Sequence, residues 1–246
     1  MLGLGIASFV EGGSVSKSIA SFINSKSLDF DGTNDYVNTN YTANTLFRGS
    51  FSFSYWINLD AQNAIPIGVE KGVHSQFLIQ HFNGGVNIIH YSNSDAALMQ
   101  SPGSAYSTDT WHHIVVVVQK NSGSDTQYKL YIDNSSISLN PLGGFAVSEA
   151  NHNAFDSSGE FLAIGAANDD GTPDNFTNGN IDEVAIFNKV LSGSEVSDIY
   201  NSGVPKDESS HDGLFMYYRF EDDVNDTTGT SNGTNNGATF SSTVPS

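Results

Sequence analysis

The chain has 246 residues, a net charge of −18 at neutral pH and no cysteine. The negative charge disfavours nucleic acid, whose phosphates it repels, and the lack of cysteine excludes disulfides, thiolate metal sites and a cysteine nucleophile. No apolar run approaches the roughly 20 residues needed to cross a bilayer, so we expect no membrane insertion.

Residues 1–26 are expected to form an arm ahead of the domain. Leu2, Leu4 and Ile6 alternate with glycines, and Phe9 follows. This alternation suits a strand that is added to a neighbouring molecule, so we predict an assembly element; the alternative is an unattached tail. The stretch lacks the basic start and compact apolar block of a secretory signal, so we expect it to be retained.

Residues 27–246 are expected to form one domain built mainly of strands. Residues 51–59 alternate with a period of two, which places Trp56 on the opposite face, against a second core or as a ligand platform. Asn83-Gly84 predicts a hairpin turn between two further strands. Additional strands are predicted from apolar runs at residues 114–118, 128–132 and 161–164.

A single short helix is predicted near residues 192–201. Ser192, with Glu195 three residues later, forms a capping box in which the two side chains satisfy free backbone donors. Apolar residues then recur on one helical face, and Gly203 provides the stop.

Residues 213–240 are expected to supply a closing strand and a tail. Such a strand can be delivered from either end of a sandwich whose first and last strands are neighbours. We therefore expect residues 214–220 to lie beside residues 28–37. A truncated second domain is the alternative, but about 30 residues cannot bury a core of their own.

Six segments of this sequence occur in a recognisable order. The segments are SLDFDGTNDYVN (27–38), FSFSYWINLD (51–60), WHHIVVVV (111–118), KLYIDN (129–134), FLAIG (161–165) and GNIDEVAIFNKVLSGSEVSDIYNSG (179–203). Together they resemble the laminin G-like domains of the concanavalin A-like lectin/glucanase superfamily. The resemblance implies an all-β fold, a jelly-roll sandwich of two antiparallel sheets.

The resemblance also implies calcium at one rim of the sandwich. Asp31, Asn34 and Asp35 crowd one turn, and Asp182 lies in the strand that closes the sandwich beside it in this family. Oxygen ligands from a tight loop and one remote carboxylate suit calcium. The alternative is a turn whose side chains bond the local backbone. The acidic loop 168–174 lacks EF-hand spacing and is expected to be a solvated turn.

Sugar binding is expected at aromatic rings. Trp56, Tyr91 and Tyr106 are the candidate exposed platforms, whereas most aromatic rings must fill the core. No catalytic residue is predicted, because the adjacent carboxylates at 182–183 and 221–223 lack the alternating spacing of glucanases. We expect no enzymatic activity.

Two functions follow from these expectations. The arm, the missing signal and the lack of cysteine resemble laminin G-like proteins of tailed bacteriophages, which implies a virion surface protein: capsid decoration, tail or fibre. Its partners would be itself or other virion subunits, and host-surface glycans. The alternative is a calcium-dependent carbohydrate-binding module of a secreted or cell-surface bacterial protein, which is extracellular; a glycoside hydrolase ranks third.

Overall fold

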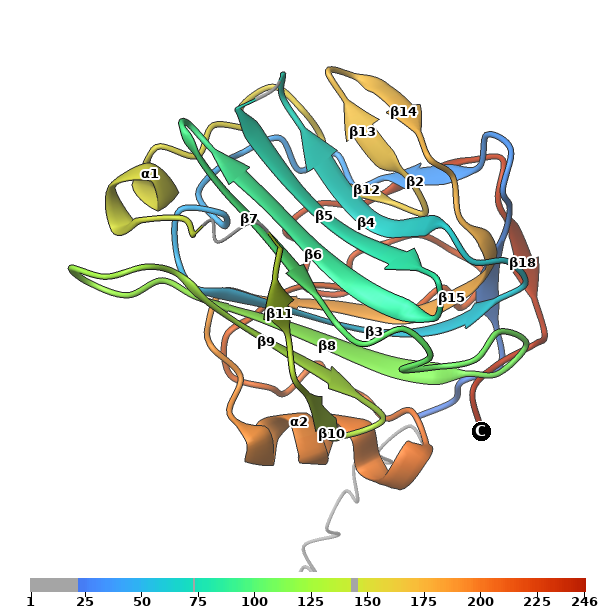
Figure 1. The fold of residues 1–246 in the computed structure, drawn as a ribbon. Helices are drawn as coiled ribbons and strands as arrows, with labels where there is room; N and C mark the ends of the chain where they lie inside the picture. The colour runs from blue at the N-terminus through green and yellow to red at the C-terminus, as the bar shows by residue number, and fades with distance from the viewer. Residues whose placement is uncertain (1–21, 73, 143–145) are drawn as a thin grey trace, which may run out of the picture.

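The computed structural model describes residues 22–72, 74–142 and 146–246. Two antiparallel sheets pack face to face around a hydrophobic core (Figure 1), which confirms the predicted sandwich. The predicted assembly residues lie outside the described residues; they are Leu2, Leu4, Ile6 and Phe9. No helix of the described part is long and apolar enough to span a membrane.

The first sheet, here called the helix-covered sheet, has eight strands in the order β10-β9-β8-β3-β15-β1-β18, with β16 paired to β15. Its strands are β1 (Ser27–Asp31), β3 (Phe51–Leu59), β8 (His112–Gln119), β9 (Gln127–Ile132), β10 (Ser135–Ile137), β15 (Asn178–Phe187), β16 (Leu214–Tyr218) and β18 (Thr239–Ser241).

The second sheet, here called the open sheet, has the order β11-β7-β6-β5-β4-β12-β2-β17 and carries the hairpin β13–β14, whose β13 pairs with β4. Its strands are β2 (Tyr36–Asn38), β4 (Ala64–Glu70), β5 (Ser75–Phe82), β6 (Gly85–Ser92), β7 (Asp95–Gln100), β11 (Asn140–Pro141), β12 (Ala163–Ile164), β13 (Ala167–Asp169), β14 (Thr172–Asp174) and β17 (Thr234–Asn236).

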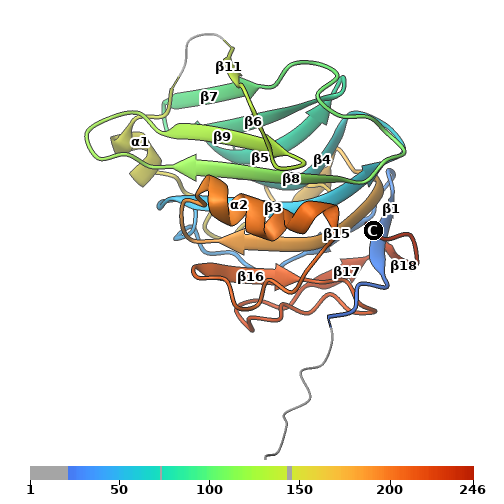
Figure 2. The same cartoon turned by 90° about the horizontal axis from the view of Figure 1, so that it is seen from below.

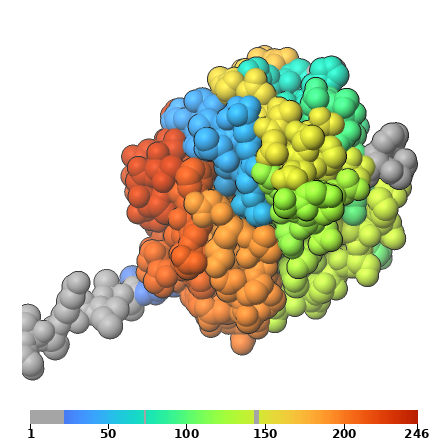
Figure 3. All heavy atoms as spheres, turned by 90° about the vertical axis from the view of Figure 1, so that its left-hand side faces the viewer, coloured from blue at the N-terminus to red at the C-terminus, as the bar shows by residue number. Residues whose placement is uncertain are grey.

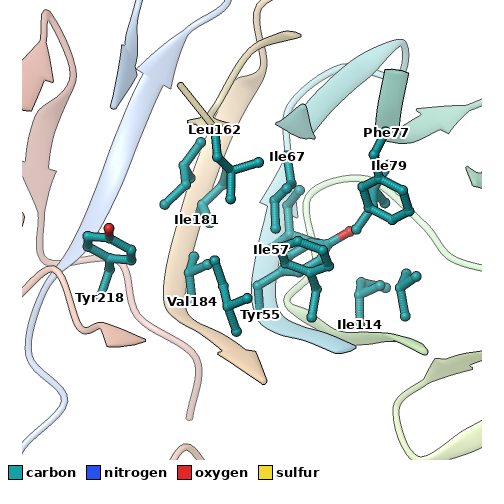
Figure 4. Packing of buried hydrophobic residues seen from close by; sticks show 14 of the residues in the cluster. Tyr55, Ile57, Ile67, Phe77, Ile79, Ile114, Leu162, Ile181, Val184 and Tyr218 are labelled. Atoms are coloured by element: carbon teal, nitrogen blue, oxygen red, sulfur yellow. The ribbon is translucent and has the colours of Figure 1, made fainter. Parts of the chain in front are cut away.

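Alternation along the strands explains the core. The odd positions of β3 are all buried between the sheets, as predicted from their period of two. Tyr55 and Ile57 of this strand meet Phe77 and Ile79 of the open sheet (Figure 4). The Asn83-Gly84 turn joins β5 to β6, and both residues have positive φ, as a two-residue hairpin loop requires.

The predicted helix is α2 (Gly193–Tyr200), which continues into the 3₁₀ turn η1 (Asn201–Gly203). Its capping box is present: Ser192 Oγ accepts from the Glu195 amide at 3.3 Å, and Glu195 Oε2 accepts from the Ser192 amide at 2.8 Å. The helix ends at Tyr200 because Asn201 adopts a left-handed φ of 47°, so the expected stop at Gly203 is corrected.

A second helix, α1 (Glu149–Asn153), was not expected from the sequence. It begins after Ser148, whose hydroxyl accepts from the Asn151 amide at 3.4 Å. A helix of one and a half turns is too short to show an apolar period, so only its N-cap could have indicated it.

The C-terminal segment contributes strands to both sheets, but not in the expected place. β18 pairs with β1 and β17 pairs with β2, whereas β16 pairs with β15. Since β1 borders the first half of β15 and β16 the second half, β1 and β16 lie end to end along one edge. Residues 214–220 therefore do not lie beside residues 28–37, which corrects that prediction.

The physical reason is a bulge in β15. The pairing with β3 jumps from Asp182 to Ala185, so two residues oppose one. Glu183 takes a φ of 47° there. On the other edge of β15 the pairing with β1 ends at Ile181 and the pairing with β16 begins at Val184, on either side of the bulge. Further along, the C-terminal segment (red in Figure 3) lies against the early part of the domain (blue), where Phe215 packs edge-on against Tyr41 with 5.3 Å between ring centroids.

Candidate functional site

The outer faces of the two sheets differ in what covers them. α2 lies across the outer face of the helix-covered sheet (Figure 2), where Val196 and Ile199 pack on Val115 and Phe187. Among the described residues no helix packs on the outer face of β4, β5, β6 and β7, which we call the open face. A sheet face that carries both polar and apolar side chains and lacks a covering layer is the candidate ligand-binding surface.

Strand register arranges the outward side chains of the open face in three rows that run across the strands. The first row is Glu70, Gln76 and Tyr91; the second is Gly68, Leu78, Ile89 and Leu98; the third is Gln80, Asn87 and Gln100. The inward neighbours of these residues face the core, so the rows follow directly from period-two alternation.

The first row joins a carboxyl, an amide and an aromatic ring. Gln76 Nε2 donates to Glu70 Oε2, and Tyr91 stands opposite Gln76 with 36% of its surface exposed. Burial, and after it the negative charges of Asp169 and Asp174, raise the pKa of Glu70 to about 7. The row therefore offers an acceptor, a donor and a ring face side by side.

The second row is apolar and tightly packed. Leu78 clusters with Ile65 and Ala167, and Ile89 packs against them. A side chain at Gly68 would approach Leu78 Cδ2 at 2.8 Å and the Ala167 backbone at 2.9 Å, so glycine is needed there. This row gives the open face a rigid floor against which the apolar C–H face of a sugar ring can lie.

The third row is a ladder of amides. Asn87 Nδ2 donates to Gln80 Oε1 at 3.1 Å, and Gln100 stands opposite Asn87 on β7. Amide side chains offer both donors and acceptors, which is what hydroxyl groups require. With the apolar floor between a polar row on each side, the open face suits a hydroxylated ligand that is flat and partly apolar.

The structure also contains a cavity of about 450 Å³ at the edge of the sandwich, between β7 and β9. Its lining residues are Met99, Thr126, Gln127, Tyr128, Lys129, Pro141 and Ala146. The lining is mainly apolar. It suits a small apolar group better than a chain of hydroxyl groups, so the open face is the stronger candidate.

The predicted calcium ligands do not converge. Asp31 Oδ1 accepts from the Thr33 amide at 2.7 Å, and Asp35 Oδ2 accepts from the Asp31 amide at 3.0 Å, as the backbone-bonded alternative requires. Asp31 pairs with Asn178, and Asp182 lies four residues further along β15, about 13 Å away at roughly 3.3 Å per residue.

The four-residue set therefore does not fit a single calcium ion. Within the described ranges no group of three His, Cys, Asp or Glu side chains is arranged to hold a metal. Calcium binding by Asn34 and its two neighbouring aspartates alone stays a prediction. A calorimetric calcium titration after chelator treatment would test it.

The three predicted aromatic platforms differ in exposure. Tyr91 is exposed and lies on the open face. Trp56 is 3% exposed, because it packs between His113 and Tyr200 under α2. Tyr106 is 7% exposed, with its ring against His81. The exposure expected of Trp56 and Tyr106 is thus corrected, since the rings of His113 and Tyr200 cover Trp56.

The acidic pair 182–183 is buried on the outer side of the helix-covered sheet. Adjacent strand residues normally face opposite sides, but the bulge turns both carboxyls the same way, and Glu208 joins them. Tyr217 donates to Glu183 Oε2, and Arg219 Nε lies 3.5 Å from Glu183 Oε1. Burial raises the pKa of Glu183 to about 8.

This buried group anchors the segment that precedes β1. The Arg219 guanidinium lies 4.4 Å from the Phe22 ring centroid and donates to the Ile23 carbonyl. Ser25 donates through its amide and its hydroxyl to Glu221, each at 2.7 Å. Residues 22–26 are therefore held against the C-terminal segment by charged side chains.

The residues of the open face were not singled out from the sequence, apart from Tyr91. The alternation of polar and apolar residues in β5 and β6 was visible there. Gln76, Leu78 and Gln80 share one face of it. The sequence did not indicate which sheet the helix covers, because this depends on where α2 packs in the folded protein.

Comparisons with known proteins agree with this architecture. Residues 31–197 match a family model described as the concanavalin A-like lectin/glucanases superfamily. A comparison with curated protein sequences finds no match. A candidate carbohydrate-binding protein of Bacteroides ovatus is similar in structure, with a TM-score of 0.60 and 17% identity. The similarity covers 90% of this chain but only 61% of that protein.

Two other solved structures share the fold. The CBM40 domain of the Ruminococcus gnavus IT-sialidase has a TM-score of 0.54 and 17% identity over 70% of this chain and 95% of that domain. A sialidase of Streptococcus pneumoniae has a TM-score of 0.53 and 19% identity over 71% of this chain and 27% of that enzyme. Because the family model matches residues 31–197, more than half of the chain, the chain belongs to the concanavalin A-like lectin/glucanase superfamily.

Proposed function

We propose that this protein is a non-catalytic glycan-binding module whose ligand lies on the open face. The observation that carries the proposal is the three-row arrangement on a sheet face that no described helix covers. Amides supply hydrogen bonds to hydroxyl groups, the apolar row supports the C–H face of a sugar ring, and Tyr91 supplies an exposed ring for stacking.

The proteins that share the fold support this class of ligand. The Bacteroides ovatus protein is a candidate carbohydrate-binding protein, and the CBM40 domain has been solved with α2,3-sialyllactose bound. At identities below 20% these similarities support the scaffold and leave the ligand to the residues of this chain.

Hydrolysis is the alternative that one observation favours. Glu70 is a buried acid with a raised pKa beside aspartates, a property of general acids in glycosidases. Hydrolysis also needs a second carboxylate across the glycosidic bond, and since Glu70 is the only one in β4, β5 and β6, the candidates are Asp169 and Asp174 of the β13–β14 hairpin. If the wild type releases reducing ends from an oligosaccharide and the Glu70→Gln variant does not, hydrolysis is favoured over binding alone.

A place on the surface of a bacteriophage virion is the finer form of the proposal. Its support is the glycine-alternating arm of the sequence, and the glycan-binding face would then contact the host surface. The same face on a secreted or cell-surface bacterial protein is the alternative. Association of the chain with purified virions, detected by antibody, separates the two.

The open face is tested with a glycan array of neutral, amino and sialylated oligosaccharides. We expect the wild type to bind, and the double variant Gln80→Ala/Tyr91→Ala to lose the signal. Val204→Ala is the matched control, because it truncates an exposed apolar side chain away from the open face. Binding that survives in the double variant would exclude the open face as the site.

A further inference from the structure

The first row of the open face ends in a concentration of negative charge. Asp169 of β13 pairs with Glu70, and Asp174 pairs with Ala167, whose side chain belongs to the outer apolar cluster. Since residues of one strand that are two apart share a face, Asp169 and Asp174 lie on the same side as Glu70. Asp170, at the tip of the hairpin, adds a further carboxylate whose charge acts on Glu70.

No positive charge on these strands offsets the carboxylates. β4, β5, β6, β7, β13 and β14 contain no lysine and no arginine. The nearest basic residue in sequence, Lys71, is bound elsewhere: its Nζ lies 3.3 Å from Asp156 Oδ2 and donates to the Ser158 carbonyl at 2.8 Å. The charge of the row is therefore uncompensated within the described strands.

Glu70 is the carboxyl group most affected by the absence of a neighbouring positive charge. Its side chain is only 8% exposed, and the groups around it are the Gln76 amide and three aspartates of the β13–β14 hairpin. A buried carboxylate is normally paired with a cation or held neutral, and here burial and then the neighbouring aspartates raise the pKa of Glu70 to about 7. A bound cation would supply that partner.

A metal ion does not fit the position. Among the residues that the structure describes, no three acidic or histidine side chains are arranged around one point. An organic ammonium group needs no such convergence, because it donates hydrogen bonds to acceptors at longer and more varied distances than a metal ion allows. Tyr91 adds an exposed ring two strands away, roughly 10 Å at the spacing of neighbouring strands, which is where the sugar ring that carries the ammonium group can stack.

Resting on the proposed glycan-binding function, we propose that the open face selects an amino sugar with a free, protonated amine over N-acetylated and sialylated glycans. The amine lies toward Glu70, Asp169 and Asp174, and the sugar ring lies between Gln76 and Tyr91. A sialic acid carboxylate at the same place meets the carboxylates of Asp169, Asp170 and Asp174 and no positive group on these strands. This ligand class differs from the sialyllactose bound by the CBM40 domain that shares the fold.

The test compares three probes by titration calorimetry at a pH where the sugar amine is protonated. They are a glucosamine oligosaccharide, its N-acetylated counterpart of the same length, and α2,3-sialyllactose. We expect the free-amine oligosaccharide to bind roughly tenfold tighter or more than the N-acetylated one. This advantage should shrink between about 0.01 M and about 1 M salt, where the screening length falls from roughly 30 Å to roughly 3 Å.

The variant Asp169→Asn/Asp174→Asn should remove most of that advantage while leaving N-acetylated ligands unaffected. Asp109→Asn is the control, because it neutralises an exposed carboxylate outside these strands at a φ that asparagine tolerates. Equal or weaker binding of the free-amine probe, or binding independent of salt, would overturn the amine preference and leave glycan binding standing. Absence of binding to every oligosaccharide, on the array and in calorimetry, would overturn the proposed function itself.

Discussion

Glu70 is the single residue whose protonation we expect to be most visible in the stability of the open sheet. Its pKa is about 7 in the folded protein, against an ordinary value of 4.5. The folded state therefore holds a proton that the unfolded chain releases between these two pH values. The contribution of Glu70 to stability is full below about pH 4.5 and is lost as the pH rises through 7.

Glu70→Gln should remove this loss, because glutamine keeps the acceptor for Gln76 and carries no charge. We expect the melting temperature of the variant, relative to the wild type, to rise between pH 5 and pH 8. Thermal unfolding over a pH series measures this, with Asp109→Asn as the control. A difference that does not change with pH would show that Glu70 is ionised in both states throughout this range.

Tyr91 is the residue at which binding and stability should separate. Its ring is exposed, so Tyr91→Ala should change the unfolding midpoint little, whereas loss of a stacking ring should weaken glycan binding by about 0.5–1.5 kcal/mol. Calorimetry of binding and urea unfolding of the same preparation measure both. Equal affinity of variant and wild type would remove Tyr91 from the site.

Among the elements, α2 distinguishes the two sheets because it covers only one of them, and its N-terminal cap stabilises this helix. Ser192→Ala removes the acceptor of the Glu195 amide, and loss of such a cap costs about 1 kcal/mol. Urea unfolding should show this decrease. Ser197→Ala, which deletes an exposed hydroxyl in the middle of the helix and leaves the cap in place, should cost less; equal losses would mean that the cap is not formed.

The bulge in β15 depends on the side chains buried around it. Tyr217→Phe removes the hydroxyl that donates to the buried Glu183 carboxyl, which should cost about 1–3 kcal/mol of unfolding free energy. Tyr131→Phe is the matched control, a half-buried tyrosine on the same side of that sheet. An equal effect of the two variants in urea unfolding would show that the hydroxyl does not satisfy Glu183.

The elements that could be predicted from the sequence are those with a local cause. Alternation predicts β3, Asn83-Gly84 predicts the β5–β6 turn, and the capping box predicts the start of α2. The bulge at Glu183 could not be predicted, because its positive φ is stabilised by contacts with Tyr217 and Arg219, more than thirty residues later. The expected neighbour of residues 214–220 was wrong for the same reason.

The residues of the candidate site could not be predicted in full, because contacts between distant segments decide which side chains are exposed. Exposure of an aromatic ring depends on what packs over it. Trp56 and Tyr91 both occupy outward positions of their strands, yet α2 covers the first and no described helix covers the second. The outward position is a property of the local sequence, whereas the covering layer is a property of the whole fold.

For the whole molecule, the arm stays a prediction that truncation tests. Removing residues 1–21 leaves the contacts of residues 22–26 with Arg219 and Glu221 in place, so the domain should remain folded. If the arm is an assembly element, light scattering should show an oligomer for the full chain and a monomer for the truncated one. The same mass for both would contradict an assembly role.

Binding at the open face can be located by mapping the backbone amide resonances while the strongest oligosaccharide of the glycan array is added. We expect shifts concentrated in β4, β5, β6 and β7, with the largest around Gln76, Gln80 and Tyr91, and small shifts elsewhere. Shifts centred on the cavity at Met99 and Tyr128, with the open face unchanged, would contradict it.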